Sequence, residues 1–349
     1  MKDIISNDVV EILADETIPW ERLKNSKVII TGASGLIGRY FLYTLCALNS
    51  QRDYGIKVTA IVRDRNKIEN DHRIQNVDFI EKDLSFHFEP NLAADFFIHA
   101  AGIASPSLYC NDPVKTIRTS TISTDILLEC AYKCKAERFL LLSSGEVYGV
   151  LPSDKSTDEG EYGPMDPLTR RASYGEGKRI AETMCYAWNK QYQVPTVIAR
   201  LGHTFGPSIS LMDDRAFSVF IKNVVFGEDI VLESDGSAMR TFCYMTDAIR
   251  ALFLVLLKGE CGEAYNVINS NNYHSIREFA FLLAELPDAE KTKVVFGKGA
   301  APQIYRNREH RLYPPNIEKT LALGWRPRVF LKEGIERTVE HIVSSKKGN

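Results

Sequence analysis

The stretch Val28–Gly38, VIITGASGLIG, decides the fold of this chain. Its first residues, Val-Ile-Ile at 28–30, predict a buried strand, and apolar residues over 36–48 predict a helix directly after it. Between the two, glycines at 32, 35 and 38 permit a tight turn and let backbone N–H groups approach a pyrophosphate. A glycine triplet by itself also suits a purely structural turn, but this strand–turn–helix context favours a dinucleotide site.

Strands and helices alternate outward from this point. Further strands are predicted at 58–62, 77–80, 95–100, 138–143 and 196–200, and long helices at 113–134 and 172–191. The alternation predicts the α/β class, with a Rossmann-type, doubly wound parallel sheet that binds ligands at the carboxyl ends of its strands. A short helix and turn are expected over 8–24, before the first strand. Beyond residue 202, shorter strands and helices predict a smaller C-terminal α/β part that completes a cleft.

Composition and charge exclude several classes of partner. The 349 residues include 43 basic and 45 acidic side chains, a net charge of −2, so no field of one sign attracts nucleic acid or anionic lipid. The apolar run 251–257 is shorter than the roughly 20 residues that span a bilayer and is expected to be a buried helix. The N-terminus, MKDIISNDVVEILADE, lacks the basic head and long apolar centre of a secretory signal, which favours a cytoplasmic location. Seven scattered cysteines without nearby histidines suit a reducing compartment and argue against a metal site.

A second motif, SSGEVYG at 143–149, follows the predicted strand 138–143 and precedes Tyr174-x-x-x-Lys178. On a helix this spacing puts both side chains on one face. The Lys178 ammonium is therefore expected to lower the pKa of the Tyr174 phenol from about 10 and make it an acid/base near neutrality. Tyrosine and lysine four residues apart also occur by chance in many helices, so the pair alone leaves a structural role open.

Together with His99-Ala100-Ala101-Gly102, these motifs resemble the extended short-chain dehydrogenase/reductase family of nucleotide-sugar enzymes, from about residue 27 to about residue 343. The likeness is strongest to UDP-glucuronate decarboxylases and then to nucleotide-sugar 4,6-dehydratases. It is carried by the segments ASPSLYCNDPVKTIRTSTIST, YGEGKRIAETMCYA, DGSAMRTFCYMTD and LGWRPRVFLKEGI. The resemblance implies an N-terminal helical extension at 1–25, a dinucleotide-binding domain at 26–202 and 243–268, and a substrate-binding domain at 203–242 and 269–349.

The resemblance also implies a bound NAD. The residues assigned to it are Gly32, Ser34, Gly35, Leu36, Ile37, Gly38, Arg63, Asp83, Leu84, Ala100, Ala101, Gly102, Tyr174 and Lys178. The glycines would hold the pyrophosphate, and Asp83 would face the adenine end. Where NAD enzymes usually place an acid for the ribose, the chain reads Val-Arg-Asp-Arg at 62–65. Arg63 suits the 2′-phosphate of NADP or stacking on adenine, so NADP stays open, while Asp64 remains within reach of the ribose. NAD is preferred because decarboxylases and dehydratases regenerate their cofactor in each turnover.

By position in the family pattern, Tyr174 would be the base that takes the proton of a sugar hydroxyl. Lys178 would be its electrostatic partner and a ribose ligand, and Ser144 would hydrogen-bond the same sugar oxygen. Glu146 stands where decarboxylases and dehydratases place an acid, which would remove a proton from C5 or orient a substrate carboxyl. A solvated acid at the strand end is the alternative reading of Glu146.

The residues expected to bind substrate are Ser105, Ser144, Glu146, His203, Arg215, Arg240 and Arg311. Arg240 would meet the substrate diphosphate, although a lone arginine is often a solvated surface charge. Arg311 departs from the family in its spacing to the proline, isoleucine and lysine that follow. Ser120 and His203 stand where relatives carry asparagine, and both are expected on the substrate face.

These assignments predict an enzyme that oxidises the C4 hydroxyl of a nucleotide hexose with a tightly held nicotinamide cofactor, and then decarboxylates or dehydrates the sugar. A nucleotide-sugar 4-epimerase or 4-keto reductase is the alternative, which Ser120 and His203 keep open. A non-catalytic NAD(P) sensor is a third reading, disfavoured by the intact Ser144, Tyr174 and Lys178. The resemblance also implies a homodimer formed through the helices at 113–134 and 172–191.

Overall fold

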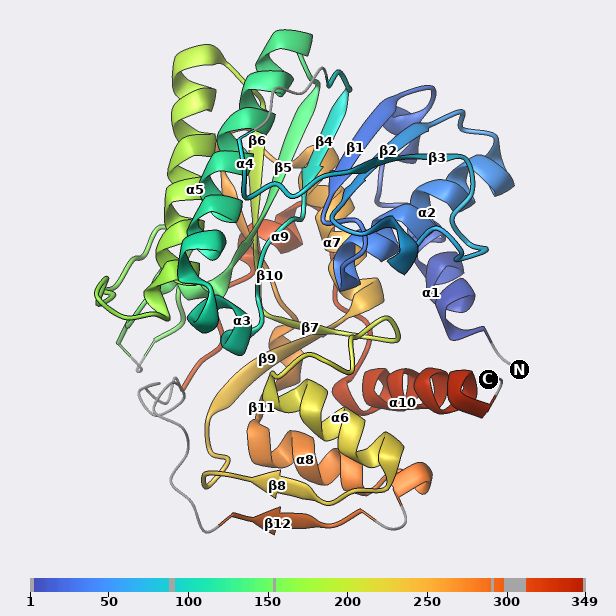
Figure 1. Ribbon diagram of the computed structural model, residues 1–349, viewed down its shortest axis with the longest axis vertical. Helices are drawn as coiled ribbons and strands as arrows, with labels where there is room; N and C mark the ends of the chain where they lie inside the picture. Colours follow the sequence, from blue (N-terminus) through green and yellow to red (C-terminus); the bar gives the residue numbers. More distant parts are fainter. Residues whose placement is uncertain (1–2, 88–91, 153–154, 290–291, 298–311, 348–349) are drawn as a thin grey trace.

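A parallel sheet of seven strands forms the centre of the upper half of the molecule, in the order β10-β6-β5-β4-β1-β2-β3 (Figure 1). The computed structural model describes residues 3–87, 92–152, 155–289, 292–297 and 312–347. The strands are β1 (Lys27–Thr31), β2 (Lys57–Val62), β3 (Val77–Glu81), β4 (Phe96–His99), β5 (Arg138–Ser144), β6 (Thr196–Leu201) and β10 (Ala264–Val267). The strand order reverses between β1 and β4, which is where doubly wound sheets bind ligands. The predicted fold class is therefore confirmed.

Helices cover both faces of the sheet. The helices α4 (Pro113–Cys134) and α5 (Ala172–Tyr192) pack on one face, and α2 (Leu36–Arg52) and α7 (Met245–Lys258) on the other (Figure 1). Alternate side chains of β1 pack on opposite faces of the sheet. Ile30 belongs to the hydrophobic cluster that includes side chains of α2 and α7, and Ile29 to the cluster that includes side chains of α4 and α5. The predicted helix at 113–134 is confirmed residue for residue, and the apolar run 251–257 is buried inside α7.

The lower half of the molecule has a second hydrophobic core, rich in phenylalanine. Its elements are β7 (His203–Phe205), β9 (Met239–Tyr244) and β11 (Tyr273–Ser275) in one small sheet, β8 (Ile230–Leu232) and β12 (Val294–Phe296) in another, and helices α6 (Ala216–Phe226), α8 (Ile276–Ala284) and α10 (Leu331–Lys347). The shorter helices are α1 (Ile4–Leu13), η1 (Trp20–Leu23), η2 (Arg65–Lys67), α3 (Pro106–Asn111), η3 (Gly145–Tyr148), η4 (Ser270–Asn272), η5 (Pro287–Ala289) and α9 (Glu318–Ala322). Sequence patterns did not predict α3, nor β7 inside the turn-rich stretch 202–214.

The N-terminal helix α1 is bonded to both halves through one carboxylate. Asp8 is 1% exposed and accepts hydrogen bonds from Tyr40 of α2 at 2.7 Å, from Tyr244 of β9 at 2.8 Å and from Arg337 of α10 at 3.1 Å. Burial raises the pKa of Asp8 to about 6, against the opposing effect of these three donors. The helix therefore connects the element that follows the glycine-rich loop with the lower half.

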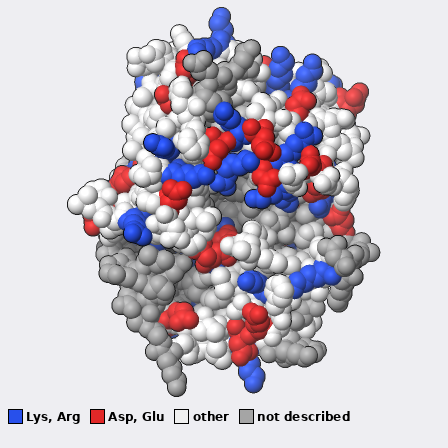
Figure 2. All heavy atoms as spheres, in the orientation of Figure 1, with Lys and Arg blue, Asp and Glu red and all other residues white. Residues whose placement is uncertain are grey.

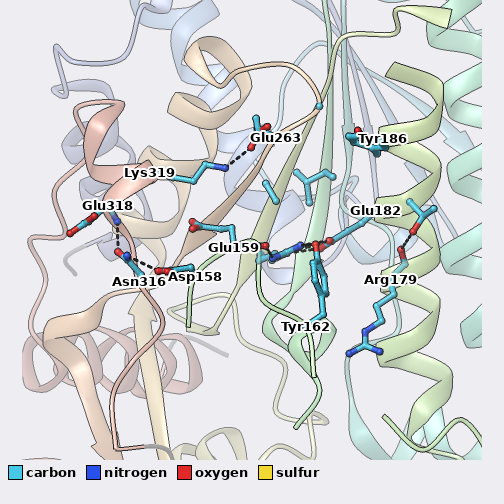
Figure 3. Close-up of a pocket in the computed structure, with 16 residues that line it drawn as sticks. Asp158, Glu159, Tyr162, Arg179, Glu182, Tyr186, Glu263, Asn316, Glu318 and Lys319 are labelled. Carbon is cyan, nitrogen blue, oxygen red and sulfur yellow. Dashed lines mark hydrogen bonds and ion pairs between the residues drawn. The ribbon is translucent and has the colours of Figure 1, made fainter. Parts of the chain in front are cut away.

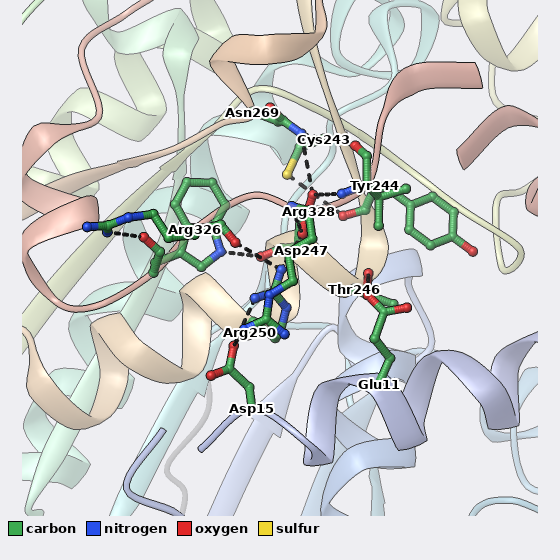
Figure 4. Close-up of polar contacts among 12 residues, drawn as sticks. Glu11, Asp15, Cys243, Tyr244, Thr246, Asp247, Arg250, Asn269, Arg326 and Arg328 are labelled. Atoms are coloured by element: carbon green, nitrogen blue, oxygen red, sulfur yellow. Dashed lines mark hydrogen bonds and ion pairs between the residues drawn. The ribbon is translucent and has the colours of Figure 1, made fainter. Parts of the chain in front are cut away.

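A buried ionic network continues this connection (Figure 4). Arg250 of α7, which has no exposed surface, donates to Asp15 at 2.8 Å and also to Asp247. The Asp247 carboxylate in turn accepts the backbone N–H groups of Arg328 at 2.9 Å and Val329 at 3.0 Å. These contacts fix the segment that leads into α10 against the sheet half.

The described surface is mixed in charge. On the face shown in Figure 2, basic and acidic side chains are interspersed rather than gathered by sign. No helix in the described ranges has both the length and the apolar character needed to cross a membrane.

Candidate active site

The glycine-rich loop between β1 and α2 has little room for side chains. Gly32 has a φ of +64°, and a Cβ there would lie 2.7 Å from the Ala100 carbonyl oxygen. A Cβ at Gly38 would lie 2.4 Å from the Gly32 carbonyl oxygen, whereas one at Gly35 would approach that oxygen only to 3.2 Å. Gly32 and Gly38 thus allow close packing, and exposed Gly35 opens the start of α2 to an anion. Ser34, Leu36 and Ile37 lie half-buried in the same turn.

A recess of about 340 Å³ lies at the carboxyl ends of β2 and β3 and is lined by Arg63, Glu81, Lys82, Asp83 and Phe86. Burial raises the pKa of Asp83, but hydrogen bonds from Lys115 and Ser85 outweigh it and lower the pKa to about 2. The ammonium of Lys115 lies 2.8 Å from the Asp83 carboxylate. Leu84 is buried, and Asp64 accepts from the N–H of Asn66 at the start of η2. The recess offers two cations, Arg63 and Lys82, and two carboxylates, of which Asp83 is fixed by Lys115, where the adenine end is expected.

The loop after β4 is held by a buried histidine. His99 Nδ1 lies 2.7 Å from the Thr31 hydroxyl, and its Nε2 lies 3.0 Å from the Ser123 hydroxyl. Thr31 also accepts the N–H of Ala101 at 3.1 Å. Burial, assisted by the Lys178 charge, lowers the pKa of His99 to about 3, so the ring is neutral near pH 7. This network fixes residues 100–102 between the glycine-rich loop and α5.

Ser144, Tyr174 and Lys178 meet where β5 ends and α5 begins. Ser144 is the last residue of β5, and its hydroxyl is hydrogen-bonded to the Tyr174 phenol. One turn further along α5, the ammonium of buried Lys178 donates to the Leu142 carbonyl at 2.7 Å. It would lie 3.4 Å from a Cβ at Gly102, so this ammonium points to the end of β4. The three predicted catalytic residues are thus brought together.

The predicted lowering of the Tyr174 pKa by Lys178 is wrong for this structure. Burial raises the pKa of Tyr174 above its ordinary value, and the hydrogen bond from Ser144 only partly offsets it. The reason is geometric, because the ammonium is directed at the Leu142 carbonyl and the β4 loop rather than at the phenol. Burial also lowers the pKa of Lys178 to about 8, although the charge of Glu182 opposes this shift.

A buried salt bridge lies one helical turn beyond Lys178 on α5. Glu182, four residues after Lys178, accepts from Arg200 of β6 at 2.7 Å and from the hydroxyl of Ser143. Arg200 also donates to the Tyr162 hydroxyl at 2.5 Å and to the Glu159 carbonyl at 2.6 Å. These residues border a recess of about 830 Å³, shown in Figure 3, where Lys319 also pairs with Glu263. None of the predicted site residues lines that recess.

Glu146 lies in η3, two residues after Ser144, and its carboxylate is paired with Arg171. The guanidinium lies 3.3 and 3.2 Å from the two carboxylate oxygens. The Glu146 N–H donates to the Ser144 hydroxyl at 3.2 Å, and that hydroxyl is hydrogen-bonded to the Tyr174 phenol, so Glu146 lies near the phenol and its charge contributes to raising the pKa of Tyr174. The ring of Tyr109 lies on the other side, stacked on that of Tyr174. Glu146 is therefore a paired carboxylate at the site rather than a solvated acid.

The other predicted substrate residues have partners within the chain. The hydroxyl of Ser105 donates to Asp214, Arg215 pairs with Asp213, and Arg240 donates to the Met239 carbonyl at 2.6 Å. The His203 ring lies against Phe217 and Phe242, at centroid distances of 5.6 and 5.9 Å. Arg311 lies outside the described residues.

Ser120 was expected on the substrate face, and that expectation is wrong. It is 3% exposed between α4 and α5, where a Cβ at Gly177 would come within 3.2 Å of its side chain. Its small size suits this close helix contact.

Sequence reasoning missed Arg171, Tyr109 and Asp214. For Arg171 a signal was present, since it stands three residues before Tyr174 and therefore one helical turn away. Tyr109 lies in α3, which no pattern predicted, and Asp214 meets Ser105 only through the tertiary fold.

Known proteins resemble this chain in sequence. A model of the NAD dependent epimerase/dehydratase family matches residues 28–268. UDP-glucuronic acid decarboxylase 1 of Danio rerio is 34% identical over 322 residues, which cover 90% of this chain and 72% of that protein. UDP-glucuronic acid decarboxylase 6 of Arabidopsis thaliana is 31% identical over 315 residues, covering 89% and 87%.

Solved structures share the fold. The dTDP-glucose 4,6-dehydratase of Streptomyces venezuelae, with NAD and TYD bound, is 22% identical with a TM-score of 0.77, covering 92% of this chain and 98% of that one. The UDP-glucuronic acid 4-epimerase of Bacillus cereus, in complex with UDP-glucuronic acid and NAD, is 23% identical with a TM-score of 0.75, covering 91% and 99%.

Proposed function

This chain belongs to the NAD dependent epimerase/dehydratase family, and from that premise we propose that it oxidises a nucleotide hexuronate at C4 and then removes its carboxyl group. It is an NAD-dependent enzyme that modifies nucleotide sugars. The observation that carries the choice of decarboxylation is the Arg171–Glu146 ion pair beside Ser144 and Tyr174. The relatives at 34% and 31% identity are named as UDP-glucuronic acid decarboxylases, which agrees with this choice.

The cofactor is NAD, and the residues present fit it. Side chains at Gly32 and Gly38 would collide with backbone, so the loop keeps its N–H groups accessible to a pyrophosphate. Arg63 and Asp83 line the recess for the adenine end, where Arg63 is proposed to stack on the base. Lys178, directed at the Gly102 loop, is proposed to bind the nicotinamide ribose. When bound, NAD supplies the oxidation of C4 and its later reversal.

Ser144 and Tyr174 define where the C4 oxygen of the sugar lies. Tyr174 is proposed to take the proton of the C4 hydroxyl, a step that first requires loss of its own phenolic proton and that its raised pKa opposes, and Ser144 hydrogen-bonds the same oxygen. Once C4 is a ketone, the bond from C5 to the carboxyl carbon breaks and its electron pair moves toward the C4 oxygen. The carboxyl group leaves as CO₂, and C5 of the resulting enolate takes a proton from water before the C4 ketone is reduced again. Ser144 and the now protonated Tyr174 are placed to stabilise the negative charge on that oxygen.

Glu146 is proposed to act in this second step by orienting the C5 substituent. It lies beside the phenol that marks C4, and C5 is the adjacent carbon. Its pairing with Arg171 leaves a carboxylate that is fixed in direction and compensated in charge.

Three finer points are proposed from the sequence. The cofactor-binding part consists of residues 26–202 and 243–268. The substrate-binding part consists of residues 203–242 and 269–349. The protein is located in the cytoplasm. It forms a homodimer through α4 and α5, which expose apolar side chains at Val114, Ile117, Ile180, Tyr186 and Tyr192. A sedimenting species of dimer mass supports the last point, and a monomer alone contradicts it.

The activity is tested by incubating the NAD-loaded enzyme separately with UDP-glucuronate, UDP-glucose and dTDP-glucose and weighing the products by mass spectrometry. Decarboxylation of UDP-glucuronate is the expected result. Loss of water from a neutral hexose would identify a dehydratase, and a six-carbon product of unchanged mass would identify an epimerase. Either of these outcomes replaces the proposed reaction.

A further inference from the structure

The guanidinium of Arg171 lies at the entrance to the proposed catalytic centre. It contacts both oxygens of Glu146, at 3.2 and 3.3 Å, and the two side chains are 26% and 31% exposed. Burial lowers the pKa of the Arg171 guanidinium, but the charge and hydrogen bond of Glu146, together with Tyr109 and Cys110, outweigh it and raise the pKa. The pair is therefore ionised and partly exposed to solvent.

Arg171 is also fixed relative to the phenol that marks C4. It stands at the start of α5, and its carbonyl accepts the backbone N–H of Tyr174 at 3.3 Å. The ring of Tyr109 is stacked on that of Tyr174 beside this turn of α5. A cation thus lies within the same cluster of side chains as the reacting oxygen.

This placement discriminates between sugars by charge. A hexuronate carries its carboxylate on C5, one bond from C4, whereas a neutral hexose carries a hydroxymethyl group there. A second carboxylate brought beside Glu146 alone would be repelled. A guanidinium has five N–H donors in a planar fork, so it can bond one carboxylate of the protein and one of a ligand together.

We propose that Arg171 is the residue that selects nucleotide hexuronates over neutral nucleotide hexoses, by donating to the C5 carboxylate of the substrate while it stays paired with Glu146. This inference rests on the proposed function, since it places C4 at Ser144 and Tyr174. It gives Arg171 a role in binding the substrate, and so separates it from the residues that move protons.

The test measures binding rather than turnover. NAD-loaded protein carrying Tyr174→Phe, which blocks the reaction, is titrated with UDP-glucuronate and with UDP-glucose in a calorimeter. Arg171→Met in this background is expected to weaken UDP-glucuronate by about 10- to 100-fold, the range for a lost charge-assisted hydrogen bond, and to leave UDP-glucose within about 2-fold. Arg171→Lys keeps the positive charge but loses the planar fork of donors. Its affinity for UDP-glucuronate should therefore lie between that of the protein with Arg171 and that of Arg171→Met.

The neighbouring Arg170→Met is the matched control, because Arg170 is exposed and one residue away. It should leave both affinities unchanged. Equal weakening of the two sugars in Arg171→Met, or no weakening of UDP-glucuronate, overturns the inference, and thermal melting shows that each variant is folded. Two results separate this inference from the proposed function. If enzyme that retains Tyr174 releases no CO₂, but Arg171→Met still abolishes the preferential binding of UDP-glucuronate over UDP-glucose, the proposed reaction is wrong and the role of Arg171 in selectivity stands. If CO₂ is released and the preference survives Arg171→Met, the selectivity role fails alone.

Discussion

The ring of Tyr109 lies stacked on the ring of Tyr174, with centroids 5.3 Å apart and planes inclined by 8°. Tyr109 is 3% exposed, so the stack is part of the packed interior beneath the cleft. The Tyr174 hydroxyl is held by Ser144 at one end while its ring face is held by Tyr109. The direction of the Tyr174 hydroxyl is thereby set from two elements, β5 and α3.

Removal of this stack should affect turnover more than binding. Tyr109→Ala leaves the face of Tyr174 without its partner, and a misdirected catalytic group commonly costs about 10- to 100-fold in rate. Tyr109→Phe keeps the ring and should turn over near the wild-type rate. Steady-state kinetics with UDP-glucuronate distinguish the two, and an alanine variant with unchanged kcat would mean that the stack does not orient Tyr174.

The loop glycine that is open to the ligand can be tested apart from those that are packed. A Cβ at Gly35 would lie 3.2 Å from the Gly32 oxygen, a tight contact that a small shift of the loop relieves, so Gly35→Val is expected to fold, which thermal melting checks. The valine side chain would occupy the pyrophosphate position and weaken the binding of NAD by roughly 10- to 100-fold. Gly160→Val is the control, since a Cβ there meets nothing within 4 Å. Unchanged NAD affinity in Gly35→Val, measured by calorimetry, would remove this loop from the cofactor site.

The N-terminal helix should make stability depend on pH through Asp8. Its pKa is about 6 in the folded chain against an ordinary value of 3.8, so the folded state holds the proton more tightly. The resulting stabilisation is present below pH 3.8 and is lost as the pH rises through 6, a change of about 3 kcal/mol. The unfolding free energy of the wild type relative to that of Asp8→Asn should therefore fall by about 2.4 kcal/mol from pH 4 to pH 7, most of the full change. Denaturant titrations that give a constant difference would contradict the assignment.

The buried network of Arg250 should be costly to break. Arg250→Met leaves the buried Asp247 carboxylate without its guanidinium and Asp15 with Arg328 alone, and such a loss typically destabilises by about 3–5 kcal/mol. The exposed pair of Glu129 and Lys133 in α4 is the comparison, because Lys133→Met should cost below about 0.5 kcal/mol. Urea unfolding of both variants gives the two values, and similar losses would argue against a special role for the network.

Local sequence signals were sufficient for the sheet half. The strand–glycine–helix pattern at 28–38 and the alternation after it correctly predicted the parallel sheet, because buried parallel strands and long helices have strong periodicities. Spacing predicted that Tyr174 and Lys178 share a face of one helix, α5, whereas the place of Ser144 beside them, at the end of β5, was expected from the family resemblance.

The rest depends on contacts between distant segments. The direction of the Lys178 ammonium is set by the Leu142 carbonyl, and Tyr109 reaches Tyr174 from another helix. The burial of Ser120 follows from its contact with Gly177 across two helices. Such pairings leave no periodic trace in the sequence, so residue type alone did not predict them.

The central claim is that oxidation at C4 and loss of the carboxyl group are separate steps, with Glu146 needed for the second. The most direct measurement is a single turnover of NAD-loaded Glu146→Gln with UDP-glucuronate, following the absorbance of reduced nicotinamide and the release of CO₂ together. In Glu146→Gln we expect reduced nicotinamide to accumulate while little CO₂ appears. Tyr174→Phe is the control and should show neither signal, with turnover lower by about 10²–10⁴-fold. Release of CO₂ by Glu146→Gln at the wild-type rate would contradict the account.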